Sequence, residues 1–248
     1  MLGIIGGTGL TQLANLNITR RQLIRTPYGE PSGPLTFGEI AGHQVVFLPR
    51  HGSGHTIPPH LVNYRANVWA MSSEGVTNIV AVTTVGGIHP DLKPGRIALP
   101  DQLIDYTQGR KNSYYEGEDK PVRHIDFTQP YCPQTRELCK QAASRVDEAL
   151  IDGGIYAVVQ GPRLETAAEI NRLERDGATM VGMTGMPEAA LARELDMSYA
   201  ALCPVANYAA GRGSSVNGIQ YEEVGVVLGQ AMERVRKLIE QVVILHAD

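Results

Sequence analysis

Cysteine is scarce in this chain of 248 residues, which has only Cys132, Cys139 and Cys203. An odd number of thiols without C-x-x-C spacing provides neither a disulfide framework nor a zinc site. Cys139 lies in an expected helix and Cys203 in an apolar run, so we expect both to pack in the interior rather than act as nucleophiles. This cysteine usage favours a reducing compartment and predicts a cytoplasmic protein.

The chain also lacks a large excess of charge of either sign and has no long apolar run. The formal net charge is only −4 at pH 7, which argues against a general nucleic-acid binder. No apolar run approaches the roughly 20 residues that a membrane-spanning helix needs, and the first residues do not resemble a signal peptide. We therefore expect no nucleic-acid or membrane partner, and an anionic substrate must be held by a local site.

Several common catalytic signatures are missing. The turn from Gly3 to Leu10 lacks G-x-G-x-x-G spacing, because Gln12 stands where the third glycine belongs, and it lacks the lysine of a P-loop. No G-x-S-x-G nucleophile elbow is present. His51 and His55 are four residues apart, but the glycines between them argue against a helical pair of metal ligands. These absences disfavour a nicotinamide oxidoreductase and predict no metal site.

Short apolar runs alternate with helical patterns along the chain. Buried strands are predicted at Leu2–Ile5, Val45–Leu48, Ile79–Val82, Ile97–Leu99, Ile155–Val159, Met180–Met183 and Ala200–Val205. Helices are predicted over Pro59–Glu74, Cys132–Leu150, Glu165–Asp176, Pro187–Leu195 and Glu222–Val243. The alternation predicts an α/β fold with a mixed sheet flanked by helices. No linker interrupts it, so residues 1–248 are expected to form a single domain.

The run Arg50-His51-Gly52-Ser53-Gly54-His55-Thr56 directly follows one of these strands. It combines a guanidinium, two imidazoles and two hydroxyls, and a strand that ends in such a cluster usually points it into a crevice. An oxyanion such as phosphate suits the several fixed donors of arginine. Taken alone, the run fits a polar surface loop equally well.

Three further strand ends carry hydroxyls and glycines, at Thr8, at Thr83-Thr84 and at Thr184. Backbone N–H groups in such turns can cradle an anion. Each one alone is weak and is compatible with an ordinary tight turn. Together with Arg50 they predict a crevice lined by hydroxyls and backbone donors.

Two polar side chains have alternative interpretations. Glu165 follows Gln160-Gly161-Pro162-Arg163-Leu164, and it either favours a helix start or accepts a hydrogen bond from a ligand N–H. Asn207 closes the last apolar run, either as a turn residue or as a combined donor and acceptor. The long polar segment 108–130 reads as an excursion from the sheet, of a kind that is often functional or at an interface.

The ordered segments GIIGGTGL from Gly3, RHGSGHTIPP from Arg50, VNYRANVWA from Val62, VTTVGG from Val82, QGPRLET from Gln160 and GMTGMPE from Gly182 resemble the purine nucleoside phosphorylase family, most closely its methylthioadenosine phosphorylase branch. The resemblance covers nearly the whole chain. It implies an α/β fold around a mixed, partly barrel-like sheet, a homotrimer, and phosphorolysis of a nucleoside. Inorganic phosphate is then a co-substrate, and no metal or organic cofactor is expected.

The resemblance also implies residue roles. Phosphate is expected to contact Thr8, Arg50, His51, Thr84, Thr184 and the backbone of Val85. Met183 is expected under the ribose, and Leu164 stands where the family usually places an aromatic ring against the purine, which implies looser stacking. No covalent nucleophile is needed, because positioning and hydrogen bonding can stabilise an oxocarbenium-like transition state. Asn207 and His51 are the residues expected to act in catalysis.

The residues expected to select the purine base differ from those of the methylthioadenosine branch. That branch typically has aspartates where this chain has Asn207 and Ala209. An amide can donate to a 6-oxo group and to N7, and Glu165 can accept from N1–H, which only a 6-oxopurine carries. An ionised Glu165 facing the unprotonated N1 of adenine would be unpaired, at a cost of roughly 1–3 kcal/mol. The hypothesis is therefore a 6-oxopurine enzyme.

The resemblance also implies that four residues lie near the 5′ end of the substrate. Tyr221, with Val224 beside it, aligns through a gap with a histidine that often meets a 5′-hydroxyl. His124 matches a residue that a neighbouring subunit contributes in the methylthio branch, although an ordinary loop histidine is the plain alternative. With His55, these favour 5′-methylthioinosine as substrate. The alternatives are methylthioadenosine, inosine or guanosine phosphorolysis, and a non-catalytic nucleoside-binding protein.

Overall fold

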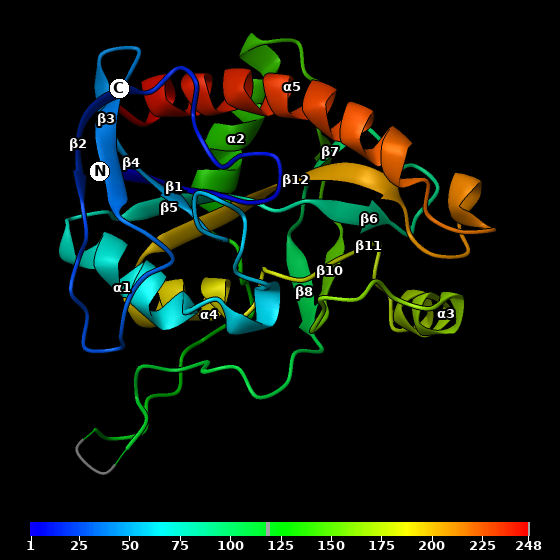
Figure 1. Cartoon of the computed structure of the whole chain (residues 1–248), viewed down its shortest axis with the longest axis horizontal. Coiled ribbons are helices and arrows are strands. Elements are labelled where there is room, and N and C mark those ends of the chain that lie inside the picture. The colour runs from blue at the N-terminus through cyan, green and yellow to red at the C-terminus, as the bar shows by residue number, and fades with distance from the viewer. Residues whose placement is uncertain (118–119, 248) are drawn as a thin grey trace.

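A computed structural model describes residues 1–117 and 120–247. Figure 1 shows a central sheet with helices on both sides. The strands are β1 (Leu2–Gly6), β2 (Asn17–Gln22), β3 (Leu35–Ile40), β4 (His43–Pro49), β5 (Asn78–Val82), β6 (Val85–Gly87), β7 (Ile97–Leu99), β8 (Gln102–Asp105), β9 (Ile151–Asp152), β10 (Ile155–Val158), β11 (Met180–Gly182) and β12 (Ser198–Tyr208). The helices are α1 (Tyr64–Ser73), α2 (Pro133–Arg145), α3 (Ala167–Arg175), α4 (Glu188–Glu194) and α5 (Tyr221–Ala247), with short 3-10 turns at Pro59–Leu61 and Gly213–Ser215.

The sheet is mixed, and its strand order is β2-β3-β4-β1-β5-β12-β6-β11-β10-β8. β1 lies between β4 and β5, and all three are parallel. The long strand β12 continues this parallel set by pairing with β5 through its first half, and it pairs with β6 through its last residues. β12 therefore joins the strands on the two sides of the sheet, and the parallel strands β1, β4, β5 and β12 end at one edge.

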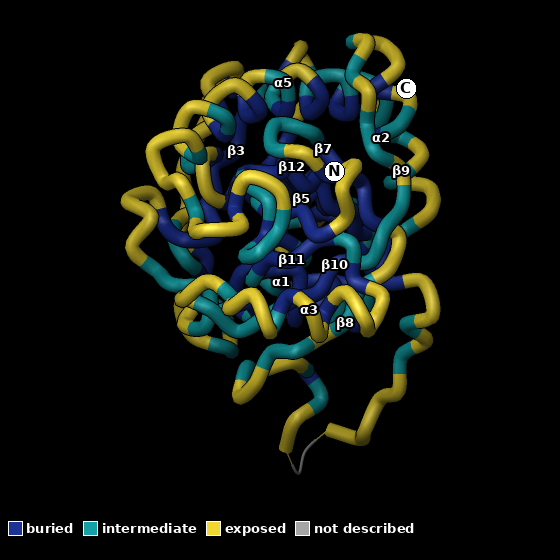
Figure 2. The backbone as a smooth tube through the Cα atoms, turned by 90° about the vertical axis from the view of Figure 1, so that its right-hand side faces the viewer, coloured by how far each residue is buried: buried dark blue, intermediate teal, exposed yellow. Residues whose placement is uncertain are grey.

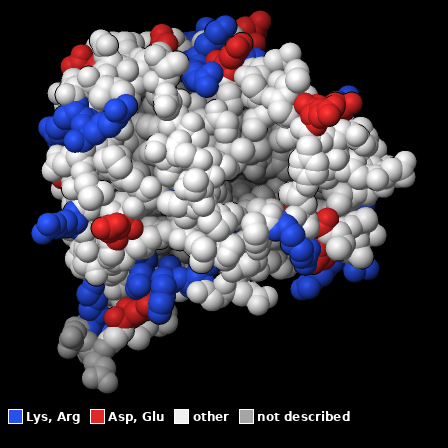
Figure 3. Space-filling view, viewed as in Figure 1, with Lys and Arg blue, Asp and Glu red and all other residues white. Residues whose placement is uncertain are grey.

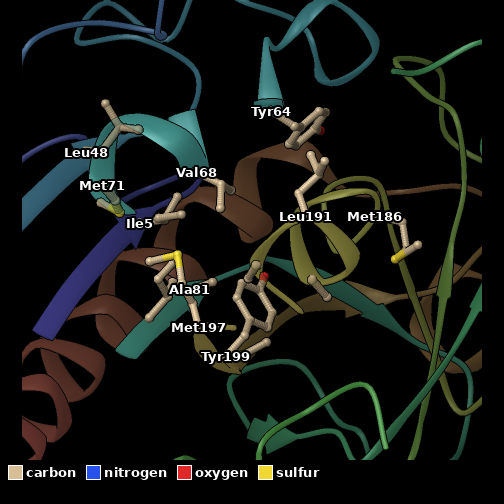
Figure 4. Close-up of a cluster of buried hydrophobic side chains, with 14 of the residues drawn as sticks. Ile5, Leu48, Tyr64, Val68, Met71, Ala81, Met186, Leu191, Met197 and Tyr199 are labelled. Atoms are coloured by element: carbon tan, nitrogen blue, oxygen red, sulfur yellow. The ribbon is translucent and has the colours of Figure 1, made fainter. Parts of the chain in front are cut away.

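The central strands are buried on both faces, which explains their continuous apolar runs. Ile5 faces a core layer with Leu48, Val68 and Leu191, which packs against α1 and α4 (Figure 4). Its neighbour Ile4 faces the opposite layer, under α2 and α5. Because successive strand residues point to opposite faces, one short apolar run supplies both layers.

The predicted mixed sheet with flanking helices is confirmed, and each predicted strand and helix overlaps an observed one. The strands β2, β3, β6, β8 and β9 were not predicted. Two of the differences have clear physical causes. β2, with sequence Asn-Ile-Thr-Arg-Arg-Gln, is exposed at every residue, so it lacks the apolar pattern of a strand. The helix expected over Pro59–Glu74 is divided, because the Asn63 side chain accepts a hydrogen bond from the N–H of Ala66 and starts α1 afresh.

The polar excursion joins β8 to α2 and extends away from the body of the molecule (Figure 1). Figure 2 shows its described residues as mostly exposed or half-buried; Glu118 and Asp119, inside the predicted segment 108–130, lie outside the described residues. Glu194 at the end of α4 anchors it, accepting from Ser113 Oγ and from the N–H of Tyr114, both at 2.7 Å. Within the described residues, no helix is long and apolar enough to cross a membrane.

Candidate active site

A cavity of about 420 Å³ opens where the parallel strands end. Loops that follow β1, β4, β5, β10 and β11 all contribute to its wall, together with the end of β12. Ligand crevices in open α/β sheets lie at such carboxyl ends. Eleven of the predicted site residues line it: Thr8, Arg50, His51, His55, Thr84, Val85, Leu164, Glu165, Met183, Thr184 and Asn207.

Arg50 lies at the base of the cavity with a fully buried side chain. Its Nε and Nη2 each donate to a carboxylate oxygen of Glu188 at 2.7 Å, and its Nη1 donates to the Val82 carbonyl at 3.0 Å. Tyr199 Oη donates to the same carboxylate at 2.9 Å. Burial alone would lower the pKa of Arg50, but Glu188 outweighs it and raises that pKa, so the guanidinium stays charged.

Glycine at position 7 makes room for this guanidinium. A Cβ there would lie 2.5 Å from the Val82 carbonyl oxygen and 2.9 Å from Arg50 Nη1. The hydrogen bonds to Glu188 and Val82 use three of the five N–H donors of the guanidinium. Two donors are left for an anion in the cavity, and their direction is set by the buried pair with Glu188.

His51 is buried beside Arg50, and its Nδ1 lies 2.8 Å from the Ile57 carbonyl. Only a protonated Nδ1 can donate to that carbonyl, so in the neutral ring Nε2 is an acceptor. Burial, with the charge of Arg50 as a second cause, lowers the pKa of His51 to about 4. The imidazole is therefore neutral near pH 7 and can accept a hydrogen bond from the protonated oxygen of a phosphate dianion.

The three threonines differ in exposure. Thr184 is buried, and its N–H donates to Tyr156 Oη at 3.3 Å. Thr84 is half-buried, and its hydroxyl donates to the Thr8 carbonyl at 3.1 Å, while Thr8 is exposed. Val85 lines the same wall from the start of β6. The three threonines line the same cavity as Arg50 and His51. Thr8 and Thr184 can offer neutral hydroxyl donors, whereas the hydroxyl hydrogen of Thr84 is directed to the Thr8 carbonyl.

Asn207 reaches the cavity through an irregularity in the sheet. Val205 pairs with Val85, but Asn207, not Ala206, pairs with Gly86, so β12 has one extra residue there. Such bulges re-aim side chains next to active sites. One amide hydrogen of Asn207 donates to the Tyr208 carbonyl at 2.6 Å, which leaves the other hydrogen and Oδ1 for a ligand.

Glu165, Leu164 and Met183 come from loops on the other side. Glu165 is half-buried, and desolvation raises the pKa of its carboxyl. It lies just before α3, whose N-cap is Thr166 with a complete Thr166–Glu169 capping box. The cap thus belongs to the neighbours of Glu165, and Glu165 itself lines the cavity as well as an adjacent pocket beside Arg163 and Glu169.

Three predicted residues do not line the cavity. Tyr221 begins α5 and is 72% exposed, and Val224 lies one turn further along the helix. His124 is exposed on the excursion. Ile219, just before α5, lines the cavity instead.

Sequence reasoning missed Glu188 and Tyr199. The only available signal was a glutamate in the otherwise apolar stretch from Met186 to Ala192, because a carboxylate among apolar residues needs a partner. Within the described residues, no three side chains of histidine, cysteine, aspartate or glutamate are grouped so as to hold a metal ion. Among the described residues that line the cavity, Arg50 is the only lysine or arginine. The middle of the face in Figure 3 likewise carries few charged side chains.

The cavity thus combines a buried guanidinium, hydroxyls and an amide in one α/β crevice, which is the class of site that binds a small anion beside an organic ring. Residues 1–244 match the family model described as the phosphorylase superfamily. The chain belongs to this superfamily.

Among its relatives, a probable S-methyl-5'-thioinosine phosphorylase of Pseudomonas syringae pv. tomato is 50% identical, with 96% of each chain covered. A 6-oxopurine nucleoside phosphorylase of Pyrococcus furiosus is 43% identical over 96% of this chain and 90% of its own. A solved structure of methylthioadenosine phosphorylase from Schistosoma mansoni with adenine superposes with a TM-score of 0.94 at 32% identity, covering 99% of this chain and 91% of that one.

Proposed function

We propose that this phosphorylase cleaves 5′-methylthioinosine with inorganic phosphate, giving hypoxanthine and 5-methylthioribose 1-phosphate. The observation that carries the proposal is that Glu165 and Asn207 line the same cavity as Arg50, His51 and Thr184. One cavity therefore holds donors for an anion and an acceptor suited to the N1–H of a 6-oxopurine. The names of the relatives from Pseudomonas syringae and Pyrococcus furiosus support a 6-oxopurine substrate.

In the proposed reaction a phosphate oxygen forms a bond to C1′ as the bond from C1′ to N9 of the purine breaks. The electron pair of that bond goes to the purine. The amide hydrogen of Asn207 that Tyr208 leaves free donates to the ring at N7 or O6, where negative charge develops. Nε2 of His51 accepts a hydrogen bond from the protonated oxygen of phosphate, while the donors of Arg50 orient the attacking oxygen. The purine leaves as an anion and takes up a proton from solvent.

Phosphate enters a site with little net charge of its own. Glu188 compensates the charge of Arg50, and His51 is neutral. Directed donors, rather than a net positive field, then hold the anion, so its attacking oxygen keeps more of its charge for C1′. This arrangement requires neither a metal nor an organic cofactor, and we propose that the enzyme uses none.

At the 5′ end, we propose that His55 and residues near the start of α5, Tyr221 and Val224, accept the methylthio group. His124 is exposed on the projecting excursion, so a second copy of the chain can receive it. A homotrimer in which each His124 reaches a neighbouring cavity follows from this proposal. A cytoplasmic location belongs to the same proposal, since three unpaired thiols fit a reducing compartment.

Competition in one phosphate-dependent assay tests the substrate. Methylthioinosine, methylthioadenosine, inosine and guanosine are compared by kcat/KM, and methylthioinosine is expected to have the highest value. In Asn207→Asp, a protonated carboxyl can accept a hydrogen bond from the 6-amino group of adenine. The ratio of methylthioadenosine to methylthioinosine cleavage is therefore expected to rise. Higher kcat/KM for adenine nucleosides in the unmodified enzyme would contradict the base assignment, and higher kcat/KM for inosine would contradict the 5′ assignment.

Light scattering after size exclusion tests the trimer. If the assembly is trimeric, Asn207→Ala chains mixed with His124→Ala chains are expected to cleave methylthioinosine faster than either variant alone, since some sites then combine two intact contributions. A monomer of full activity would contradict the proposal.

A further inference from the structure

Arg110, at the start of the excursion, makes six hydrogen bonds, all to uncharged oxygen atoms. Nη1 donates to the carbonyls of Met183 at 2.8 Å and Met186 at 2.6 Å. Nη2 donates to the carbonyls of Gln160 at 2.9 Å and Val159 at 3.3 Å. One planar cation therefore holds two chain segments that lie more than twenty residues apart in the sequence.

The two segments are those that follow β10 and β11. The first continues from Gln160 to Glu165, and the second contains Met183. They touch directly, because a Cβ at Gly161 would collide with the Met183 side chain. Leu164, Glu165 and Met183 all line the cavity, whereas Arg110 does not. Arg110 thus lies behind the wall on which the base and the ribose are expected.

The phosphate side is held by other contacts. Arg50 is fixed by Glu188 and Val82, and the N–H of Thr184 is fixed by Tyr156. Thr84 and Thr8 are joined to one another. None of these hydrogen bonds involves Arg110. Thr184 lies between Met183 and Met186, but its N–H is held separately by Tyr156. Loosening Arg110 should therefore disturb Met183 and the segment ending at Glu165 most, and should leave Arg50 in place.

We propose that Arg110 is a positioning residue for the nucleoside subsite, setting the relative place of Met183 and of the segment that ends at Glu165. This inference rests on the proposed function for the identity of the ligand. Lysine cannot replace arginine here, because an ammonium concentrates its donors at one point and cannot span both segments. The excursion therefore contributes to the chain's own cavity through Arg110, separately from any contribution of His124 to a neighbour.

The kinetic test compares Arg110→Met, Arg110→Lys and Arg123→Met. Arg123 is the matched control, because it ties the same excursion to the end of α4 through the Glu194 carbonyl and Asp196, away from the cavity. In both Arg110 variants kcat/KM for methylthioinosine is expected to fall about 10- to 100-fold, since small misplacements at a distance have such effects. KM for phosphate is expected to change less, because of its proposed contacts only Thr184 lies in a segment that Arg110 holds. Arg123→Met should remain close to the unmodified enzyme in both constants.

A guanidinium salt added to Arg110→Ala should restore part of the lost nucleoside cleavage without improving Arg123→Ala. Equal loss for phosphate and nucleoside, equal loss in the Arg123 variant, or full activity of Arg110→Lys would each overturn the inference. If Arg110→Met does not fold, Arg110→Lys, which keeps the stem and the charge, provides the same comparison.

Hydrogen exchange separates this inference from the proposed function. Without ligand, Arg110→Met is expected to exchange faster than the unmodified protein in peptides covering 159–165 and 183–187, and not in peptides covering 50–57. Unchanged exchange in the first two would overturn the inference even if the enzyme is active. Absence of phosphorolysis in the unmodified enzyme would overturn the proposed function, while the exchange result would still decide the role of Arg110.

Discussion

The two sides of the cavity are built differently. On the phosphate side, Arg50 is fully buried, and His51 and Thr184 are only 5% and 7% exposed. On the nucleoside side, Leu164 is 37% exposed and Glu165 is half-buried on a loop. The phosphate donors Arg50, His51 and Thr184 are thus held in the core. The choice of base rests partly on Glu165, a loop residue that can change without disturbing the fold, and partly on Asn207 at the end of β12.

The largest expected effect is a loss of stability when the buried partner of Arg50 on the phosphate side is removed. Glu188→Gln leaves the buried charge of Arg50 without its carboxylate, and removing one partner of a buried ion pair costs about 3–5 kcal/mol. Urea unfolding should show this loss in the free energy of unfolding. Glu137→Gln, which removes only the surface pair with Lys140, should cost less than about 1 kcal/mol. Equal losses in the two variants would contradict the contrast between core and surface.

The lowered pKa of His51, also on the phosphate side, predicts that the stability of the protein depends on pH. That pKa is about 4 in the folded protein against 6.5 when free, so between these values the unfolded chain binds the extra proton. Stability is therefore lost as pH falls from 6.5 towards 4, by up to about 3 kcal/mol. Urea unfolding across this range should show a steeper loss for the unmodified protein than for His51→Gln. Parallel curves would show that His51 does not titrate in this way.

A substitution of Glu165, on the nucleoside side, should alter substrate specificity rather than stability. Glu165→Gln is expected to lower kcat/KM for methylthioinosine about 10- to 100-fold, the equivalent of a lost charged acceptor at about 1–3 kcal/mol. It is expected to raise kcat/KM for methylthioadenosine, because the new amide can donate to N1 of adenine. Because burial raises the pKa of Glu165, the preference of the unmodified enzyme for the 6-oxopurine should weaken as pH falls through that raised value. The glutamine variant should lack this pH dependence. An equal loss for both nucleosides would argue against contact with N1–H.

The smallest expected effect comes from a change at Leu164, on the nucleoside side of the cavity. Leu164→Phe places an aromatic ring where purine stacking is expected, and such contacts contribute about 0.5–1.5 kcal/mol beyond area burial. KM for the nucleoside should fall by a small factor while KM for phosphate and the melting temperature stay unchanged. Leu164→Ile is the control that changes shape without adding a ring. A drop in melting temperature would show that this loop residue also supports the fold.

Much of the site could be predicted because parallel strands end at one edge. Thr8 and Arg50 are far apart in the sequence, yet each directly follows a strand, and β1 pairs with β4. Motifs at strand ends were therefore expected to converge, and the cavity contains them. Edge strand β2 escaped prediction, because an exposed strand has no buried face to pattern its sequence.

The supporting contacts could not be predicted. Arg50 and Glu188 are 138 residues apart, and nothing local marks them as partners. The same is true of Arg110, which reads in the sequence as one more charge in a polar loop. Their partners are backbone carbonyls or side chains delivered by other elements, and only the register and packing of those elements bring them within hydrogen-bond distance.

The amino-acid sequence by itself determined the α/β architecture and the set of strand-end residues, because hydrophobic periodicity and turn chemistry are local properties. The superfamily followed from the resemblance of its ordered motifs and from the family match. The tertiary structure decided how these residues work. It paired Arg50 with Glu188, made His51 a neutral acceptor, turned Asn207 into the cavity by a bulge, and set His124 apart from its own cavity. These outcomes depend on burial and on contacts between distant segments, which exist only once the chain has packed.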